Sequence, residues 1–226
     1  MAHNHQVEGS NPSGSPGHIM GYIIGADEVG RGCLAGAVYV GAVLVPDDKT
    51  PVEGVGDSKA LTPKRREAVY ETLRADGETV CQVCIRPASL IDQSGIQRAL
   101  FECFREAIDR CLVQVPDGES VEIRIDGKPI GLDWHPIPTV YIVKGDATDW
   151  VIGAASIVAK VERDAYMVRM AGKYPVYGWD ANKGYGSKAH RDAIYEHGLT
   201  PLHRATFCRN WVRKPEDSID LFGLFE

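Results

Sequence analysis

The sequence predicts an α/β fold in which strands and helices alternate along the chain. Small and β-branched residues dominate from Tyr22 to Val45, as expected for two or more paired strands. Apolar residues recur at spacings of three and four from Ile96 to Leu112, which indicates one apolar face of a helix. Strand-like runs at 121–125 and 141–143 follow that helix. We therefore expect a sheet with helices packed against it.

Three further helices are predicted from the signals at their ends. Thr62 is a typical N-cap and Pro63 suits a first helical turn, so a helix is expected to run to about residue 77. A long helix is expected over about 149–172, after the second strand-like run. A last helix is expected to begin after Ser187 and to end near Gly198.

Length and composition are those of a globular protein. The chain has 226 residues, of which 44% are hydrophobic, so it can bury a full core. No apolar stretch is long enough to cross a bilayer and the N-terminus lacks the order of a secretory signal, so we expect a cytoplasmic location and no membrane partner. The net charge of -6 argues against an undiscriminating nucleic-acid binder, although local phosphate contacts remain compatible with it.

Composition also divides the chain into three parts. Residues 1–18 are rich in His, Asn, Gly, Ser and Pro without an apolar period, so they are expected to be a disordered tail or an expression tag. Residues 19–208 carry all the predicted strands and helices and are expected to form the main domain. Residues 209–226 are expected to be a C-terminal tail.

The cysteines are expected to be small core residues. Cys81 and Cys84 lie in an apolar strand-like run, and Cys103 and Cys111 lie in a helical pattern. A Cys-x-x-Cys pair can begin a zinc site, but no second Cys/His pair follows at finger spacing. The sequence therefore disfavours a zinc site.

An acidic pair that runs into a glycine-rich turn is the strongest functional signal. Asp27 and Glu28 follow the apolar run 22–24 and precede Gly30-Arg31-Gly32, so they are expected near a strand end, where loops and ligands meet. Successive side chains on a strand point to opposite faces, so both carboxylates reach one metal cluster only if the strand distorts or ends. We therefore predict a bulge or break at Glu28. The alternative is a strand that finishes in a solvated acidic turn.

Two more aspartates follow strand-like segments. Asp126 ends the alternating run 121–125, and Asp146 follows the apolar run 141–143. Strand ends that meet at one edge of a sheet bring distant carboxylates together, and clustered carboxylates suit hard cations such as Mg²⁺. Two such ions can activate a water and stabilise the leaving oxygen of a phosphodiester. The alternatives are an ordinary turn at Asp126 and a helix cap at Asp146.

Taken together, these segments resemble ribonuclease HII, the type 2 ribonuclease H. The resemblance covers about Gly21 to Phe207, with the motifs in the family's order. The segments that carry it are Asp27-Glu28-Val29-Gly30-Arg31-Gly32, Leu34-Ala35-Gly36, Asp57-Ser58-Lys59-Ala60-Leu61, Ile125-Asp126-Gly127, Lys144-Gly145-Asp146, Ala154-Ala155-Ser156-Ile157-Val158-Ala159-Lys160-Val161 and Lys183-Gly184-Tyr185-Gly186-Ser187-Lys188-Ala189-His190.

The resemblance implies a ribonuclease H-like fold, with a central mixed β-sheet flanked by helices and a C-terminal helical portion. It implies an endonuclease that uses two Mg²⁺ or Mn²⁺ ions to cut RNA in RNA–DNA hybrids and to incise 5′ of single ribonucleotides in duplex DNA, leaving 3′-hydroxyl and 5′-phosphate ends. By motif match, the metal-binding and catalytic residues are Asp27, Glu28, Asp126 and Asp146.

Substrate recognition is also implied by the resemblance. In the family, the Gly-Arg-Gly turn and a tyrosine contact the ribose 2′-hydroxyl, the group that distinguishes RNA from DNA at one position. Lysine and serine side chains are plausible phosphate ligands. The substrate-binding residues expected here are Gly30, Arg31, Gly32, Ser58, Lys59, Lys183 and Tyr185. The chain departs from many relatives at Cys33 and Ala37, where prolines are common, and at Asn182, where histidine is common.

The C-terminal segment resembles a sliding-clamp-binding peptide. Such peptides present an aliphatic and one or two aromatic residues from a flexible tail. Asp217–Glu226 is apolar but short and follows a proline-containing linker, although Ser218 replaces the usual leading glutamine. The alternative is a tail that docks on its own domain. We otherwise expect a monomer.

Three other functions compete with the leading interpretation. Ribonuclease HIII members normally carry an extra N-terminal domain and lack the arginine of the glycine turn, so Arg31 disfavours that family. A non-catalytic nucleic-acid-binding module on the same fold would be expected to lack a carboxylate. Another nuclease or recombinase of the same fold would be expected to lack the combination of the Gly-Arg-Gly turn and Tyr185.

Overall fold

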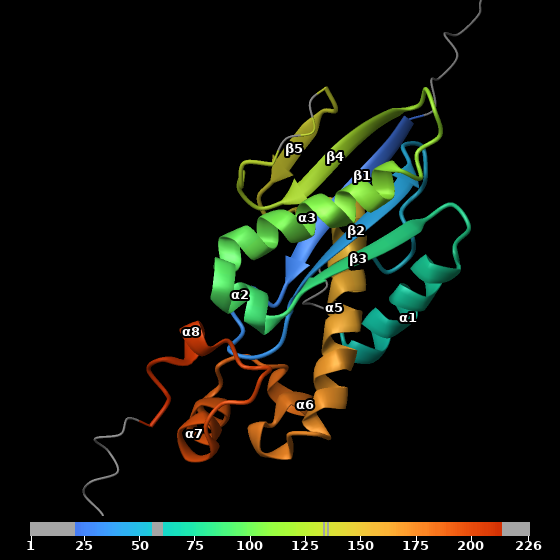
Figure 1. Cartoon of the computed structure of the whole chain (residues 1–226). Helices are drawn as coiled ribbons and strands as arrows, with labels where there is room; N and C mark the ends of the chain where they lie inside the picture. Colours follow the sequence, from blue (N-terminus) through green and yellow to red (C-terminus); the bar gives the residue numbers. More distant parts are fainter. Residues whose placement is uncertain (1–20, 56–60, 133, 135, 214–226) are drawn as a thin grey trace, which may run out of the picture.

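The protein is built around a mixed five-stranded sheet, described here from a computed structural model in which residues 21–55, 61–132, 134 and 136–213 are placed (Figure 1). The strand order is β3-β2-β1-β4-β5. Strand β1 pairs antiparallel with β2 and parallel with β4, which confirms the predicted mixed sheet. The strands are β1 (Gly21–Val29), β2 (Val38–Pro46), β3 (Val80–Arg86), β4 (Ser120–Asp126) and β5 (Thr139–Ile142).

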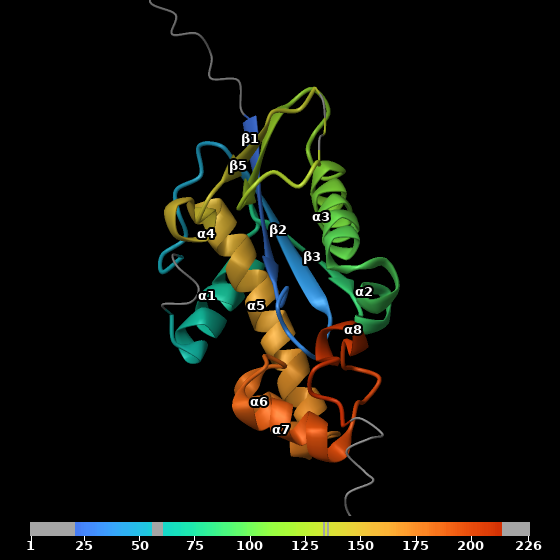
Figure 2. The same ribbon diagram turned by 90° about the vertical axis from the view of Figure 1, so that its left-hand side faces the viewer.

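Helices cover both faces of the sheet, as Figure 2 shows edge-on. Helices α2 (Ala88–Ser94) and α3 (Ile96–Leu112) lie on one face. Helices α1 (Pro63–Ala75) and α5 (Trp150–Ala171) lie on the other. The predicted bounds of α1, α3 and α5 are confirmed, and Thr62 caps α1 by accepting a hydrogen bond from the Arg65 N–H.

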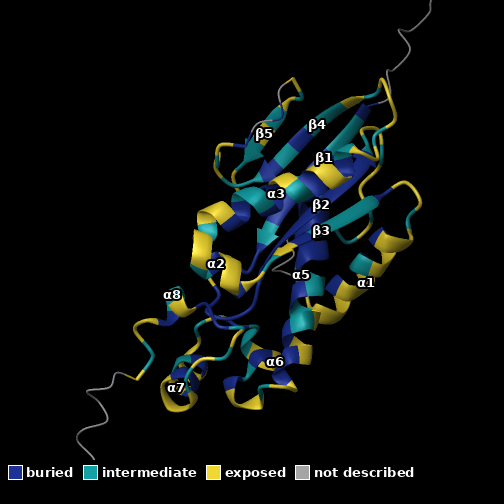
Figure 3. Ribbon diagram, in the orientation of Figure 1, coloured by how far each residue is buried: buried dark blue, intermediate teal, exposed yellow. Residues whose placement is uncertain are grey.

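The alternation of side chains along the central strands builds one core on each face. Val40 and Leu44 of β2 pack against α3, whereas Val43 and Val45 pack against α1 and α5. All four are buried, and Figure 3 shows β2 buried along nearly its whole length, whereas the outer strands β3 and β5 are mostly intermediate. Each fully buried aliphatic side chain contributes about 1.5–3 kcal/mol relative to exposure, so these two cores fix the sheet between its helices.

Two glycines let α5 approach the sheet closely. A Cβ at Gly41 of β2 would lie 2.2 Å from the Ala155 carbonyl oxygen, and one at Gly25 of β1 would lie 2.5 Å from the Val151 carbonyl carbon. Larger residues at these positions would push the helix away. The close approach brings the middle of α5 over the end of β1, where Asp27 pairs with Gly41.

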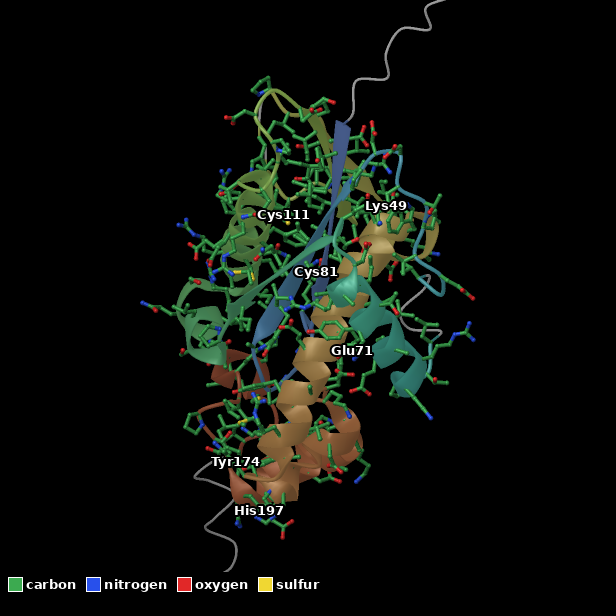
Figure 4. All side chains as sticks on the ribbon, turned by 90° about the vertical axis from the view of Figure 1, so that its right-hand side faces the viewer. Lys49, Glu71, Cys81, Cys111, Tyr174 and His197 are labelled. Carbon is green, nitrogen blue, oxygen red and sulfur yellow. The ribbon has the colours of Figure 1, made fainter. Side chains whose placement is uncertain are left out.

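The C-terminal third forms a helical end beyond the sheet. Its helices are η1 (Pro175–Tyr177), α6 (Trp179–Asn182), α7 (Lys188–His197) and α8 (Ala205–Cys208). Tyr174 and His197 mark this end of the molecule in Figure 4. A separate apolar cluster that includes Trp179, Ile194 and Met167 holds these helices to the last turns of α5. The predicted helix after Ser187 is confirmed, whereas the short helices were not predicted.

Asp146 does not lie at a strand end. Strand β5 stops at Ile142, and Asp146 lies in the short helix α4 (Gly145–Thr148), which connects β5 to α5. The cap of α5 is Asp149, whose side chain accepts hydrogen bonds from the Val151 and Ile152 N–H groups. The alternative role of Asp146 as the cap of the long helix is therefore wrong.

The predicted bulge or break at Glu28 is also wrong. Strand β1 pairs with β2 in unbroken register through Asp27↔Gly41, Glu28↔Val40 and Val29↔Tyr39. The partner on the other side ends first, because β1–β4 pairing stops at Ala26↔Ile125. The edge of β1 beyond Ala26 is therefore open on the β4 side, and the strand needs no distortion for its two carboxylates to approach Asp126.

Three of the four cysteines predicted to lie in the core are buried: Cys84, Cys103 and Cys111, the last on α3 in Figure 4. Cys81 is only half-buried. Among the described helices, none has the length and apolarity needed to cross a membrane. The expectations for residues 1–18, for Ser58 and Lys59, and for the segment 217–226 lie outside the described residues.

Candidate active site

A cavity of about 350 Å³ is lined by residues at the carboxyl ends of β1 and β4. In Figure 1 these two strand ends point towards the side of the sheet where the helical end lies. The cavity gathers residues from β1, the turn after it, β4, α5 and the loop before α7. The residues that line it are Asp27, Glu28, Val29, Gly30, Arg31, Gly32, Asp126, Ser156, Lys160 and Tyr185. The structure therefore brings together seven of the predicted metal or ribose ligands, Glu28 among them, from segments up to 158 positions apart.

The two carboxylates of β1 enter this cavity from opposite faces of the strand. Asp27 is 5% exposed and lies on the α5 face, where the Ser156 side chain hydrogen-bonds to it. Its Oδ1 also accepts a hydrogen bond of 2.7 Å from the Glu28 N–H. The Glu28 side chain is more exposed, and its Oε1 lies 3.5 Å from Nη1 of Arg31. The open edge of β1 lets both groups line one space.

Asp126 and Asp146 are linked through the backbone of Gly145. The Gly145 N–H donates a hydrogen bond of 2.6 Å to Oδ1 of Asp126. A Cβ at Gly145 would lie 2.6 Å from Cδ1 of Ile152, so a larger residue here would require the Ile152 side chain to shift. Asp146, the next residue, is 5% exposed and lies behind the cavity rather than on its lining.

The electrostatics of the cluster favour a bound cation. Burial raises the pKa of Asp27 to about 8, the Ser156 hydrogen bond opposes this, and the negative charges of Glu28, Asp126 and Asp146 add to it. Burial also raises the pKa of Glu28, against the lowering effect of Arg31. The donors are all carboxylate oxygens, which is the chemistry that Mg²⁺ and Mn²⁺ prefer. The residues present therefore fit a hard divalent cation.

The carboxylates lie near one another, but they are not arranged as a complete set of metal ligands. Within the described part of the chain, no three His, Cys, Asp or Glu side chains meet the geometry for holding one metal ion. A bound cation would therefore need side-chain rotations that bring more carboxylate oxygens towards it.

A buried arginine donates hydrogen bonds to the backbone of the glycine-rich turn. Arg204 is fully buried and donates hydrogen bonds to the carbonyl oxygens of Gly30 at 2.8 Å, Arg31 at 2.8 Å and Gly36 at 3.0 Å. Burial lowers the pKa of Arg204 to about 10, so the guanidinium stays charged at neutral pH. Arg204 therefore fixes the backbone of a turn whose residues Gly30, Arg31 and Gly32 line the cavity.

A second buried arginine joins this turn to the loop that carries Tyr185. Arg163 of α5 is fully buried and donates to the carbonyl oxygens of Ala35 at 3.1 Å, Ala37 at 3.1 Å and Lys183 at 2.9 Å. Gly30 has φ +90°, and a Cβ there would lie 2.2 Å from Nε of Arg163. Residue 30 must therefore be glycine for both its backbone conformation and its contact with Arg163.

Tyr185 lies at the rim of the cavity with its ring accessible. The residue is 43% exposed, and its ring centroid lies 5.9 Å from Nζ of Lys160 and 5.8 Å from Cζ of Arg163. Its hydroxyl hydrogen-bonds to the buried Cys33 thiol. Burial raises the pKa of Tyr185, so the hydroxyl stays protonated at neutral pH.

Two buried histidines form a chain of hydrogen bonds that ends at the backbone carbonyl of Tyr185. The Thr200 N–H donates to Nδ1 of His203, whose Nε2 lies 3.2 Å from Nε2 of His190. Nδ1 of His190 lies 2.9 Å from the Tyr185 carbonyl oxygen and donates to it. Burial lowers the pKa of His203 to about 4 and also lowers that of His190, so both rings are neutral at pH 7 and complete a chain of hydrogen bonds. The two histidines therefore support the loop that carries Tyr185.

Lys183 lies outside the carboxylate cavity. It lines an adjoining groove of about 790 Å³ between α1, α5 and α6, which shares Lys160 and Tyr185 with the cavity. Its Nζ donates to the Asp180 carbonyl oxygen, and its backbone is left-handed, with φ 51°. Asn182 holds this turn, because its Oδ1 accepts from the Gly184 N–H at 2.8 Å.

Sequence reasoning missed several residues that shape the site. Ser156 and Lys160 belong to a segment that carries the family resemblance, but no local pattern marks them as cavity residues. Arg163 and Arg204 carried no signal, because an isolated arginine in a helix or loop is usually exposed. Five of their six hydrogen bonds to carbonyl oxygens span 126 to 174 positions of sequence.

Comparisons with known proteins agree with the fold and the site. A family model described as ribonuclease HII matches residues 24–210. A ribonuclease HII from Bacteroides thetaiotaomicron is 43% identical, covering 81% of this chain and 88% of that protein. The crystal structure of the ribonuclease H2 from Pyrococcus horikoshii OT3 has a TM-score of 0.66 at 26% identity, covering 84% of this chain and 96% of that one.

A further solved structure shares the fold. The structure of the PCNA:RNase HII complex from Archaeoglobus fulgidus has a TM-score of 0.67 at 24% identity, covering 88% of this chain and 100% of the matched chain. These matches confirm the ribonuclease H-like fold predicted from the sequence. The chain therefore belongs to the ribonuclease HII family and is an enzyme of the metal-dependent nuclease class.

Proposed function

We propose that the protein is an endonuclease that hydrolyses the RNA strand of RNA–DNA hybrids and incises 5′ of single ribonucleotides in duplex DNA, leaving 3′-hydroxyl and 5′-phosphate ends. The observation that carries this proposal is one shared cavity, in which three carboxylates adjoin the Gly-Arg-Gly turn and Tyr185. The carboxylates provide for phosphodiester hydrolysis, and the turn and the tyrosine provide for recognition of a ribose.

The catalytic residues in this proposal are the four carboxylates Asp27, Glu28, Asp126 and Asp146, which would hold two Mg²⁺ or Mn²⁺ ions. When bound, the ions would supply Lewis acidity that activates a water and stabilises the leaving oxygen. Ser156 orients Asp27 through its hydrogen bond, and the Gly145 N–H orients Asp126. The residues therefore act by holding cations at fixed positions, without a nucleophilic side chain.

Recognition of the ribose is assigned to the backbone of Gly30, Arg31 and Gly32 together with Tyr185. A 2′-hydroxyl both donates and accepts hydrogen bonds, so backbone groups and a phenol hydroxyl can recognise it. The Tyr185 hydroxyl is protonated and can donate, and its ring offers a stacking surface. Ser58, Lys59 and Lys183 remain proposed phosphate ligands, and the groove that Lys183 lines adjoins the cavity.

The proposal is tested with an end-labelled DNA duplex that contains one ribonucleotide. With Mg²⁺ or Mn²⁺ we expect incision immediately 5′ of the ribonucleotide, and with chelator we expect none, because the carboxylate cluster has no other means of activating water. Analysis of the end groups should give a 3′-hydroxyl and a 5′-phosphate. An all-DNA duplex of the same sequence is the control and should stay intact.

Other outcomes would change the proposal. Cleavage restricted to duplexes with a run of ribonucleotides would indicate a ribonuclease HIII-like preference. Binding without cleavage in either metal would indicate a nucleic-acid-binding module. Cleavage that persists in chelator would contradict the assignment of the four carboxylates.

The variant Tyr185→Ala is expected to lower kcat/KM at a single ribonucleotide by roughly 10- to 100-fold, the range for losing one aromatic contact with a nucleotide. The fold should persist, because the ring is 43% exposed. Tyr195→Ala on α7 is the matched control, since Tyr195 is 49% exposed and lies outside the cavity. Unchanged cleavage by Tyr185→Ala, or an equal loss in Tyr195→Ala, would refute the role of Tyr185.

We also propose that residues 19–208 form the catalytic unit of a monomer and that the tail 209–226 binds a sliding clamp. Support for the tail comes from its sequence and from the fold relative of Archaeoglobus fulgidus, which is described in complex with PCNA. Gel filtration of the full chain and of a chain ending at Pro215, each mixed with a clamp, would test this. Equal co-elution of the two would contradict it.

A further inference from the structure

A basic groove continues the active-site cavity on the side away from Tyr185. It has a volume of about 670 Å³ and lies between the first turns of α3 and the β4–β5 connection, which are neighbours in Figure 1. Its cationic side chains are Arg31, Arg98 and Lys128. Arg31 lines both the groove and the carboxylate cavity, so the two spaces share a wall.

The three cations are available to a ligand. The side chains of Arg31 and Arg98 are 49% and 67% exposed, and Lys128 is exposed. Arg98 contacts Glu102 one turn along α3, an exposed pair that is worth little in water. Lys128 has no ion-pair partner within the described part of the chain. None of the described residues that line the groove is acidic, in a chain whose net charge is -6.

Rigid elements present these cations. Arg98 lies on the 17-residue helix α3, whose inner face is buried in the core. Lys128 follows Gly127, which has φ +92° and whose N–H donates 2.9 Å to the Ile142 carbonyl oxygen of β5. Arg31 lies in the turn whose carbonyls Arg204 holds. The positive charges therefore have fixed positions relative to Asp126, two residues before Lys128.

The groove of Lys183, the carboxylate cavity and the basic groove are three adjoining concave spaces. The groove of Lys183 shares Lys160 and Tyr185 with the carboxylate cavity, and the cavity shares Arg31 with the basic groove. A strand whose ribonucleotide lies at the Gly-Arg-Gly turn would extend in both directions from the cavity. One arm would enter the groove of Lys183, and the other would enter the basic groove.

We propose that the groove formed by Arg31, Arg98 and Lys128 binds backbone phosphates of the cleaved strand, on the arm opposite Tyr185. The inference rests on the proposed function, because it takes the position of the ribonucleotide from it. Lys128 and Arg98 contact phosphate rather than bases, so they contribute affinity without selecting sequence. Binding through the groove is electrostatic and releases counterions.

The test measures binding of a fluorescent duplex with one central ribonucleotide, in chelator, as a function of salt. The double variant Arg98→Ala/Lys128→Ala is expected to bind about tenfold more weakly at 0.1 M salt and to reduce the slope of log K against log salt by about 1.5–2, close to one unit for each phosphate that is no longer neutralised. The control Arg110→Ala/Lys173→Ala removes the same charge from exposed positions outside the groove, and its slope should match the wild type.

Shortened duplexes locate the site on the substrate. Shortening either arm should weaken binding of the wild type. Binding by the double variant should weaken only when the arm on the Tyr185 side is shortened, because the variant no longer binds the opposite arm. Equal responses to both arms in the double variant, or an unchanged salt slope, would overturn the proposal. An equal reduction of the salt slope in the control variant would also overturn the proposal. Such a result would show that the slope depends on the net charge of the protein rather than on the groove.

Steady-state cleavage separates this inference from the proposed function. The double variant is expected to raise KM by about tenfold with kcat within twofold of the wild type, because the groove lies outside the carboxylate cluster. A wild-type enzyme that fails to cut the single-ribonucleotide duplex would refute the proposed function, and the salt slopes would still decide whether the groove binds phosphate. A fall in kcat with an unchanged KM would contradict the groove proposal.

Discussion

Asp126→Asn is expected to lower kcat at a single ribonucleotide by at least about 1,000-fold, which corresponds to about 4 kcal/mol of lost transition-state stabilisation. The change keeps the size of the side chain and an oxygen that can accept the Gly145 N–H. It removes the negative charge that the proposed cations need as a ligand. The measurement is cleavage of the labelled duplex in saturating Mg²⁺ and, separately, in Mn²⁺.

The same variant is expected to be as stable as the wild type or more stable. The negative charge of Asp126 repels Asp27 and Glu28 and raises the pKa of both. Removing this charge therefore relieves electrostatic repulsion in the folded protein when no cation is bound. Urea unfolding in chelator measures this. Asp117→Asn in the exposed turn after α3 is the control and should change neither property. A folded Asp126→Asn enzyme with normal turnover would refute the metal assignment.

The sequence predicts those parts of the fold that depend on local patterns. The apolar face of α3, the N-cap and first-turn proline of α1 and the alternation along β4 each lie within one segment, and each prediction is confirmed. The positions of Asp27 and Asp126 at the same edge of the sheet follow from these elements. Parallel neighbours such as β1 and β4 bring their carboxyl ends together.

The error at Glu28 has a physical reason. Side chains alternate along any extended strand, and this alternation carries no information on where a neighbouring strand ends. Here β2 stays paired to Val29 while β4 pairing stops at Ala26, so the edge of β1 is open without a bulge. The lengths of neighbouring strands are a tertiary property, which no local pattern in β1 encodes.

The supports of the recognition loops were not predictable either. Arg163 and Arg204 act through carbonyl oxygens of residues distant in sequence, and the His190–His203 pair acts through the Tyr185 carbonyl oxygen. Any residue offers a carbonyl oxygen, so the receiving positions carry no compositional signal. Only the three-dimensional arrangement shows that the loops of the Gly-Arg-Gly turn and Tyr185 share these internal donors.

Arg204→Met is expected to lower the free energy of unfolding by roughly 3–5 kcal/mol, because it removes three hydrogen bonds from a charged donor, each worth about 1.5–3 kcal/mol, while methionine keeps part of the packing. The carbonyl oxygens of Gly30, Arg31 and Gly36 would lose this donor at buried or partly buried positions. Urea unfolding measures this loss. Arg209→Met, at an exposed position just after α8, is the control and should change stability by less than about 1 kcal/mol.

Loss of folding alone could explain reduced cleavage by Arg204→Met, so Arg204→Lys separates stability from recognition. Lysine keeps the charge, but its single ammonium group cannot reproduce the planar fork that contacts three carbonyl groups. We expect Arg204→Lys to stay folded at 25 °C and to lose more activity at a single ribonucleotide than on a continuous hybrid. A turn with a less fixed backbone would recognise a 2′-hydroxyl less well, and a substrate with only one such group should be affected most. Equal losses on both substrates would contradict a role for Arg204 in positioning the turn, and its contribution would then be to stability alone.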